Sequence, residues 1–299
     1  MRISLLFLSF LFFSGGASAE SPAALPASIP GVIVDKKTNS LHLVTYQGSA
    51  YKINKTYHTT LGLVAGDKEI EGDKKTPEGI YFFEEVRRPP NLEAKFGRMA
   101  LTMNYPNAWD RHMKRTGSGI WFHATNEPSR LTRDLDSLGC VVVKDEELGE
   151  IFPQLRYRVS PISIYEDFTR DKAVLAPERL AAIEQMVVDW AAAWQSKDLE
   201  KYIGFYHPDF SSEGENLPAW RAHKGNLNRR YAKIIVTVSR VQAFAHPKYD
   251  VAIFNQIYES RNANGSVAKK SGGVKILYIA KAKDGTPRIL SEQYRNTEI

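Results

Sequence analysis

The pattern of apolar residues changes once along this chain of 299 residues, near residues 166–178. Before that point, short apolar runs alternate with turn residues, which favours a β-rich fold. After it, apolar residues from Leu180 to Trp194 recur at helical spacing and predict an amphipathic helix over residues 177–195. The sequence therefore predicts two domains of different class.

The first domain, residues 31–166, is expected to be mainly β. Its strands are predicted at residues 32–34, 40–46, 50–53, 57–63, 79–83, 99–103 and 159–165. Turn residues such as Asp73-Lys74-Lys75-Thr76-Pro77 separate them. The best short helix covers residues 144–152, directly after the only cysteine of the chain.

The second domain, residues 177–299, follows a linker at residues 167–176. After its long first helix we expect a second helix over residues 198–206 and then four strands. The strands are predicted at residues 233–244, 251–260, 274–282 and 287–294. Helices first and an antiparallel meander afterwards predict an α+β cone and not a parallel sheet.

The first nineteen residues have the pattern of a cleaved secretory signal. Arg2 gives a positive start, Ile3–Phe13 are apolar, and Ala17-Ser18-Ala19 supplies small residues for cleavage. No later stretch approaches the roughly twenty apolar residues of a membrane-spanning helix. We therefore expect a signal peptide at residues 1–19, an extended leader at residues 20–30, and a periplasmic mature protein without a transmembrane segment.

Net charge constrains the partners only weakly. The chain has 40 Lys and Arg against 34 Asp and Glu, a net charge of +6 that becomes +5 without Arg2. This charge suits attraction to an anionic surface or polymer. No dense basic tract interleaved with aromatic residues indicates a nucleic-acid partner. The most basic stretch, residues 221–233, is predicted to be the solvated face of a helix.

Cys140 is the single cysteine, so it has no partner for an intramolecular disulfide. In an exported protein such a thiol is a candidate nucleophile, and His123 is the candidate base. A Cys–His pair forms a thioester with an acyl substrate and then passes the acyl group to water or an amine. Gly139 permits close backbone approach, and backbone N–H groups of residues 138–140 are candidates for the oxyanion site.

A structural role for Cys140 and His123 is the alternative. Cys140 precedes Val141-Val142-Val143 and would then be a small buried hydrophobe. A metal site is disfavoured because the seven histidines include no closely spaced pair and one cysteine rarely holds zinc. Nucleotide binding is disfavoured because no glycine-rich loop joins a strand to a helix. No metal or cofactor is therefore expected.

The residues around this pair resemble the L,D-transpeptidase catalytic domain, a family of cysteine enzymes of bacterial peptidoglycan. The resemblance covers residues 30–165 and rests on four blocks in the family's order. The blocks are Gly62 with Gly66-Asp67-Lys68, residues 71–79 with Thr76-Pro77-Glu78-Gly79, residues 118–123, and Ser137-Leu138-Gly139-Cys140. The resemblance implies that Cys140 is the nucleophile and His123 its partner.

Further site residues follow from the resemblance or from their chemistry. Ser137 and Gly139 correspond to the small residues before the thiol, and Leu138 stands where the family often has histidine. Ala124 replaces a frequent glycine and Val142 a frequent Arg or Asn. Because Leu138 and Val142 are typical of a degenerate site, a non-catalytic wall-binding module is an alternative. Candidates for binding the substrate are Arg133, Arg130, Arg111, Asn126 and Tyr105.

The reaction that the resemblance implies is acyl transfer on the stem peptides of peptidoglycan. The thiol attacks the bond between the L-centre of the third, diamino residue and the terminal D-alanine, which leaves. Water would then trim a tetrapeptide to a tripeptide, whereas an amine of a neighbouring stem would give a 3-3 cross-link. The same chemistry on a different bond attaches or releases a wall-linked protein.

Residues 177–294 resemble the nuclear-transport-factor-two-like cone, on the residues Trp190, Trp194, Tyr206-His207-Pro208-Asp209-Phe210, Trp220 and the segment 254–260. The two domains in this order are similar to the cell-shape-determining L,D-carboxypeptidases of curved and helical bacteria, which favours hydrolysis. Trp190, Trp194 and Phe210 are expected in the core of the cone. A glycan or protein partner for this domain is a hypothesis from its fusion to a wall enzyme.

Overall fold

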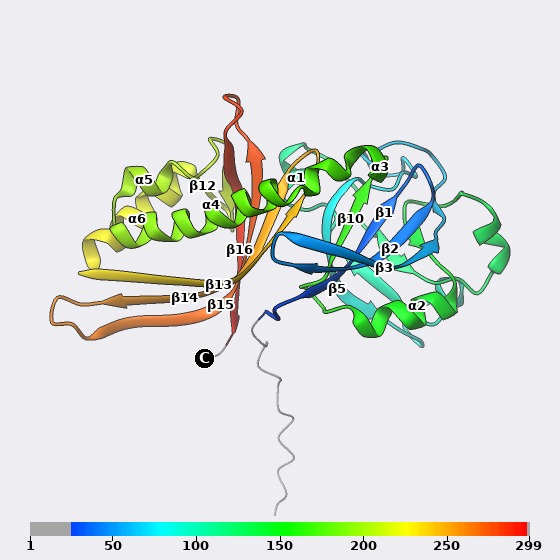
Figure 1. Ribbon diagram of the computed structural model, residues 1–299, viewed down its shortest axis with the longest axis horizontal. Helices are drawn as coiled ribbons and strands as arrows, with labels where there is room; N and C mark the ends of the chain where they lie inside the picture. Colours follow the sequence, from blue (N-terminus) through cyan, green and yellow to red (C-terminus); the bar gives the residue numbers. More distant parts are fainter. Residues whose placement is uncertain (1–24, 298–299) are drawn as a thin grey trace, which may run out of the picture.

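The computed structural model describes residues 25–297, so the predicted signal peptide and the start of the leader lie outside the described residues. A β-rich first domain lies beside a second domain in which helices cover one face of a four-stranded sheet (Figure 1). The helices are α4 (Pro177–Ser196), α5 (Leu199–Ile203) and α6 (Leu217–Arg230). The predicted fold class, a mainly β domain followed by an α+β cone, is confirmed.

An eight-stranded sheet organises the first domain, in the order β3-β2-β1-β10-β5-β6-β7-β9. Its strands are β1 (Ile29–Asp35), β2 (Ser40–Gln47), β3 (Ala50–His58), β5 (Gly79–Arg87), β6 (Ala100–Met103), β7 (Trp121–His123), β9 (Val141–Val142) and β10 (Pro161–Tyr165). Strand β1 is parallel to β10 and β7 is parallel to β9, while the other neighbours are antiparallel. A separate parallel pair joins β4 (Leu61–Gly62) to β8 (Leu135–Ser137).

Short helices connect these strands. They are η1 (Ala94–Phe96), α1 (Ala108–His112), η2 (Pro128–Thr132), α2 (Asp145–Ile151) and η3 (Phe152–Gln154). Helix α2 matches the predicted helix at residues 144–152, and its three acidic residues in the first turn suit the positive end of the helix dipole. The strand predicted at residues 57–63 is divided between the end of β3 and β4.

The central strands of the main sheet are buried on both faces. Along β5, Ile80 and Phe82 belong to a hydrophobic core shared with the second domain, whereas Tyr81 and Phe83 belong to a core of the first domain alone. Successive side chains of a strand point to opposite faces, so one strand serves both cores. The second domain thus covers one face of the sheet that carries the candidate site.

The second domain is built on the antiparallel sheet β13-β14-β15-β16. The strands are β13 (Lys233–Ala245), β14 (Asp250–Arg261), β15 (Val267–Lys281) and β16 (Pro287–Thr297), with a small hairpin of β11 (Ser211–Ser212) and β12 (Glu215–Asn216). Trp190, Trp194 and Phe210 are buried in its core, as expected. Residues 221–230 are helical, but Lys224 is buried, so the basic run is not wholly a solvated face.

The segment between the domains is itself structured. Residues 167–176 contain helix α3 (Phe168–Asp171) and helix η4 (Lys172–Leu175). Phe168 and Leu175 are buried in the shared core. At the other end of the first domain, the backbone N–H of Leu25 donates to Asn255 Oδ1 at 3.0 Å. The linker is therefore packed into the shared core, and Leu25, before β1, contacts the second domain.

Candidate active site

Two neighbouring parallel strands bring Cys140 and His123 to the same cavity. Strand β9 begins just after Cys140 and pairs with β7, which ends at His123. Both side chains line one cavity of about 420 Å³. The Cys140 thiol lies 3.7 Å from the carbonyl oxygen of Gly119 and is half-buried. Strand pairing therefore accounts for a shared cavity that a separation of seventeen residues does not predict.

The turn before the thiol is fixed by Ser137. Its Oγ donates to the carbonyl oxygen of Cys140 at 2.7 Å and accepts the N–H of Gly139 at 3.0 Å. Gly139 has φ of +123°, a conformation that side chains disfavour. Because the Gly139 N–H is bonded to Ser137, it is not free to serve an oxyanion, against expectation. The Cys140 N–H has no acceptor within residues 25–297 and is the better candidate.

His123 is held in one tautomer. Its Nδ1 lies 2.5 Å from the carbonyl oxygen of Ala124. A carbonyl oxygen only accepts, so Nδ1 carries the proton and Nε2 is the atom able to take another. Phe96 packs edge-on against the imidazole at 4.9 Å and contacts Trp121 at the same distance. These rings shield one side of the imidazole from water.

Burial keeps the pair uncharged. It lowers the pKa of His123 to about 4, and the nearby cations Arg130 and Lys95 act in the same direction while the bond to Ala124 opposes it. Burial also raises the pKa of the Cys140 thiol, against the smaller effects of the Trp121 backbone and Arg130. The resting site is thus a neutral thiol beside a neutral imidazole, not a thiolate–imidazolium ion pair.

Positive charge lies at the wall of this cavity. Arg130 donates through Nε to Asp136 Oδ2 at 2.9 Å and through Nη2 to the Asp136 carbonyl oxygen at 3.0 Å. This pairing fixes the guanidinium while its Nη1 has no partner among the described residues. Lys95 also lines the cavity and pairs with Glu93 at 2.9 Å. Leu138 lines it with 69% of its surface exposed.

The remaining expected residues lie elsewhere. Tyr105 is buried and its hydroxyl donates to the carbonyl oxygen of Thr116 at 3.2 Å, so it is a core residue. Asn126 lines a neighbouring cavity of about 490 Å³. Arg133 pairs with Asp136 at 3.3 Å outside the Cys140 cavity. Arg111 donates to the carbonyl oxygen of Pro106 at 2.6 Å on the surface.

Five residues of the cavity were not named as site residues from the sequence. They are Lys95, Phe96, Gly119, Trp121 and Glu127. Lys95 and Phe96 belong to the short helix η1 in the connection from β5 to β6, which carries no recognisable pattern. Trp121 is the exception, because it lies two positions before His123 on one strand, and a period of two places both on the same face.

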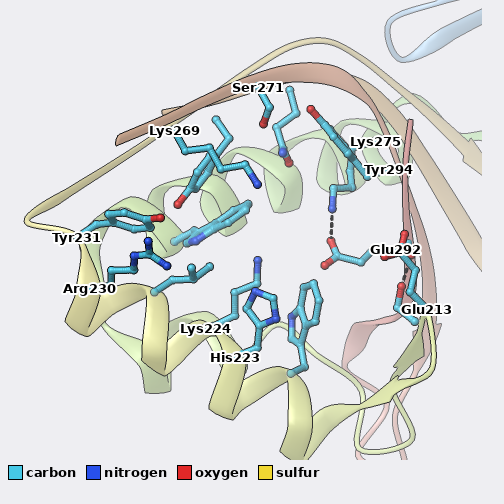
Figure 2. A pocket seen from close by; sticks show the side chains of 16 residues that line it. Glu213, His223, Lys224, Arg230, Tyr231, Lys269, Ser271, Lys275, Glu292 and Tyr294 are labelled. Carbon is cyan, nitrogen blue, oxygen red and sulfur yellow. Dashed lines mark hydrogen bonds and ion pairs between the residues drawn. The ribbon is translucent and has the colours of Figure 1, made fainter. Parts of the chain in front are cut away.

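A second cavity, of about 440 Å³, lies in the second domain between helix α6 and the sheet. Figure 2 shows Lys224 pointing from α6 into it, and the ion pair of Lys275 with Glu292, which measures 2.8 Å. The Lys224 ammonium lies 3.7 Å and 4.3 Å from the ring centres of Trp194 and Trp220. Buried polar atoms without partners in the described residues include Gln256 Oε1, Tyr258 OH and Tyr294 OH.

Within residues 25–297, no helix combines the length and apolarity needed to cross a membrane. The same part of the chain contains no group of three or more His, Cys, Asp and Glu side chains arranged to hold a metal ion.

One curated protein is similar to about half of this chain. Over 154 residues the chain is 26% identical to YafK of Escherichia coli (strain K12), which is named as a candidate L,D-transpeptidase. The alignment covers 48% of this chain and 57% of YafK, so only part of that relative is matched. The likeness therefore spans about half of this chain and just over half of YafK, and not the whole of either protein.

Two solved structures are similar over both domains. Bd1075 of Bdellovibrio bacteriovorus is 29% identical, with a TM-score of 0.74, and the match covers 92% of this chain and 99% of that one. Pgp2 of Campylobacter jejuni, a helical cell shape determining protein, is 21% identical with a TM-score of 0.65, and the match covers 89% and 92%. The Pgp2 likeness shows that the fold is shared.

Family models match each domain separately. Residues 30–164 match the L,D-transpeptidase catalytic domain, and residues 182–293 match the Cds6 C-terminal NTF2-like domain, where NTF2 is nuclear transport factor two. The two matches agree with the two structural units and with their order. Residues 30–164 therefore form a domain of the L,D-transpeptidase catalytic family, and residues 182–293 form an NTF2-like domain of the Cds6 type.

Proposed function

We propose that this protein is a periplasmic cysteine enzyme of peptidoglycan that removes the terminal D-alanine from stem tetrapeptides, and so influences cell shape. The observation that carries the proposal is the cavity that Cys140 and His123 both line. The L,D-transpeptidase match over residues 30–164 supports the reaction class. Pgp2, a helical cell shape determining protein, shares the fold over both domains, and this likeness supports the proposed influence on cell shape.

Because the thiol and the imidazole are both neutral, the first step combines proton transfer with attack by the sulfur. His123 Nε2 takes the thiol proton while Cys140 Sγ attacks the carbonyl carbon before D-alanine. The carbon–nitrogen bond then breaks, the proton passes to the leaving amine, and a thioester remains on Cys140. Water attacks the thioester with His123 again as base, which releases the tripeptide and restores the thiol. The Cys140 N–H stabilises the oxyanion, a contribution of about 3 kcal/mol in comparable sites.

The cations of the cavity suit the substrate's charge. The leaving D-alanine carries a carboxylate, and the Nη1 of Arg130 is the group positioned to bind it. Lys95 supplies further positive charge at the same wall. Leu138 gives an exposed apolar surface beside the thiol where a histidine would offer a base to an incoming amine. This favours water as acceptor, with 3-3 cross-linking or transfer on a wall-linked protein as the alternative.

The test uses purified tetrapeptide muropeptides with mature wild-type protein and the Cys140→Ala variant, with and without a tripeptide or amine acceptor. Mass spectrometry is expected to show loss of one alanine, only with the wild type, and no dimer. His123→Ala is expected to slow release by about 10²- to 10⁴-fold. Dimers would instead establish transpeptidation. Turnover by Cys140→Ala protein would exclude the thioester, and unchanged muropeptides would favour a binding module.

For the second domain we propose that the aromatic cavity binds a polar, ring-bearing part of the wall, such as its glycan. Aromatic walls with a few converging polar groups are typical of ligand sites. Burial lowers the pKa of Lys224 to about 7, and buried Gln256 and Tyr258 carry polar atoms without a partner in the described chain. Such groups are costly unless a ligand or water satisfies them.

Point variants test this role better than a truncation, because the two domains share a core. Lys224→Met is expected to lower binding to isolated sacculi, measured by co-sedimentation, while release of D-alanine from soluble tetrapeptide persists. Lys283→Met changes an exposed lysine of the same domain and is the control. Binding that is equal in the two variants would contradict the glycan role and leave a protein partner as the candidate.

A further inference from the structure

The backbone behind the catalytic turn belongs to one long segment, residues 63–78. A Cβ at Gly139 would lie 2.8 Å from the carbonyl oxygen of Lys75, so the two backbones are in close contact. The Leu63 N–H donates to the carbonyl oxygen of Ser137 at 2.8 Å. Thr76 Oγ1 accepts the N–H of Gly62 at 2.9 Å. The position of the turn that carries Cys140 therefore depends on this segment.

A lysine of the second domain fastens this segment near its ends. Lys248 Nζ lies 2.6 Å from Asp67 Oδ2 and 2.9 Å from Glu78 Oε2. Only 16% of the Asp67 side chain and 10% of the Glu78 side chain are exposed, so solvent screens these contacts less than it screens surface pairs. Burial alone would raise the pKa of Asp67, but Lys248 and Arg115 outweigh it and hold that pKa below its usual value.

The turn that carries Lys248 is anchored on both sides. His246 Nε2 contacts the carbonyl oxygen of Ile164 at 3.0 Å. The Tyr249 hydroxyl accepts the Ile80 N–H at 2.7 Å and donates to the Ile80 carbonyl oxygen at 2.9 Å. Trp109 stacks on the same tyrosine at 5.4 Å. The turn that carries Lys248 is therefore held in place on both sides, which fixes the position of the Lys248 backbone.

Lys36 completes the arrangement from the first domain. Its Nζ contacts Glu78 Oε1 at 3.0 Å and the carbonyl oxygen of Thr76 at 2.8 Å. Lys36 also contacts the carbonyl oxygen of Gly66 at 2.5 Å, but among the described residues the other ion-pair partner of Asp67 is Arg115. Removing Lys248 would leave a mostly buried pair of carboxylates with less compensation, and such a pair repels. Residues 63–78 would then be held less firmly against Gly139.

We propose that Lys248, in the NTF2-like domain, is a positioning residue for Cys140, acting through Asp67, Glu78 and residues 63–78. The second domain then contributes to the reaction through the position of Cys140, whatever ligand its own cavity binds. The inference rests on the proposed function, because positioning is measured through D-alanine release. It is also measurable without substrate, through the backbone amides that hold the turn.

The first experiment compares D-alanine release by wild type, Lys248→Met and Lys248→Arg in the full chain. Misplacement of a nucleophile by about 1 Å can cost a factor of about 10² in rate. We expect Lys248→Met to lower kcat by 10- to 100-fold with KM changed less than about twofold, and Lys248→Arg to recover most of the loss. Lys283→Met, an exposed lysine of the same domain, is the control and is expected to match wild type.

The second experiment measures hydrogen exchange at the Leu63 and Gly139 amides, which the turn uses as donors. Exchange at both is expected to be at least tenfold faster in Lys248→Met and unchanged in the control, at equal thermal stability of the core. If Lys248→Met does not fold, Lys248→Gln replaces it. Unchanged exchange at Gly139 overturns the proposal. Wild type that releases no D-alanine rejects the proposed function, while the exchange comparison still decides the role of Lys248.

Discussion

At the scale of single residues, the protonation of His123 decides when the site can work. Burial, with Arg130 and Lys95, lowers its pKa to about 4, so the imidazole is a free base at any pH above that value. An exposed histidine would lose this form near its ordinary pKa of about 6.5. The Cys140 pKa is raised by burial, so the neutral pair persists on the alkaline side as well.

The resulting prediction concerns the pH profile of kcat/KM for D-alanine release. Because protonation removes the base, activity is expected to fall only as pH drops through about 4 and to be level across neutral pH. Arg130→Met removes a cation that disfavours imidazolium, so its acid limb is expected at higher pH. Circular dichroism at each pH controls for unfolding. A fall in the wild-type kcat/KM near pH 6.5 would contradict the lowered pKa of His123.

Gly139→Ala tests the turn that presents the thiol. The residue has φ of +123°, and a Cβ there would lie 2.8 Å from the Lys75 carbonyl oxygen and 2.9 Å from Ile120 Cδ1. We expect a loss of about 1–3 kcal/mol in the free energy of unfolding, measured in urea, because the conformation is strained for a side chain. The displaced thiol is expected to lower kcat by about 10²-fold.

Gly285→Ala is the matched control for that variant. Gly285 has φ of +81°, but nothing lies within 4 Å of a Cβ at this position. It therefore reports the cost of the backbone conformation without the clash, about 1 kcal/mol. Nearly wild-type kcat is expected. Equal losses of kcat in both variants would show that the contact with Lys75 does not position the thiol.

At the scale of elements, residues 167–176 join the domains as packed helices and not as an open linker. Phe168 of α3 is buried in the shared core and lies 5.2 Å from the ring of Tyr165. Asp167 caps α3 by accepting the N–H of Arg170 at 3.0 Å. The segment is therefore part of the folded core, and a change in it is expected to affect both domains.

Phe168→Ala measures this contribution. Removing a buried phenylalanine costs about 3–5 kcal/mol when the cavity does not collapse. We expect a lower midpoint of urea unfolding with an unchanged slope, because the surface exposed on unfolding stays the same. Lys172→Ala, an exposed position of η4, is the control and is expected to change the stability by less than about 0.5 kcal/mol. A change below 1 kcal/mol for Phe168→Ala would indicate a loosely packed linker.

Local patterns predicted the elements well and long-range contacts poorly. The apolar spacing from Leu180 to Trp194 predicted α4, and short apolar runs predicted most strands, since each pattern repeats over a few residues. The burial of Tyr105 and Lys224 was missed, because it depends on partners brought in by tertiary packing. The sequence does not distinguish Lys248 from an ordinary surface lysine, because its partners Asp67 and Glu78 belong to the other domain.

At the scale of the whole molecule, the two domains behave as one packed unit. The shared core contains Ile80 and Phe82 from the catalytic domain together with Phe244 and Phe254 from the NTF2-like domain. Polar contacts add to it, since the Tyr165 hydroxyl donates to the carbonyl oxygen of Ala245 at 2.7 Å. Interfaces between domains are usually smaller and more polar than a domain core. A core that spans the boundary couples the stability of both.

Cooperative unfolding of the two domains is therefore expected. In native-state hydrogen exchange, the slowest amides of β10 and of β14 should open with the same free energy, because neither sheet keeps its packing without the other. Tyr249→Phe removes the hydroxyl that pairs with Ile80 and Asn107 and is expected to lower both values together by about 1–3 kcal/mol. His58→Ala, at an exposed position at the end of β3, is the control. Separate opening energies for β10 and β14, with only one affected by Tyr249→Phe, would mean that the catalytic domain folds independently and that its site owes nothing to the second domain.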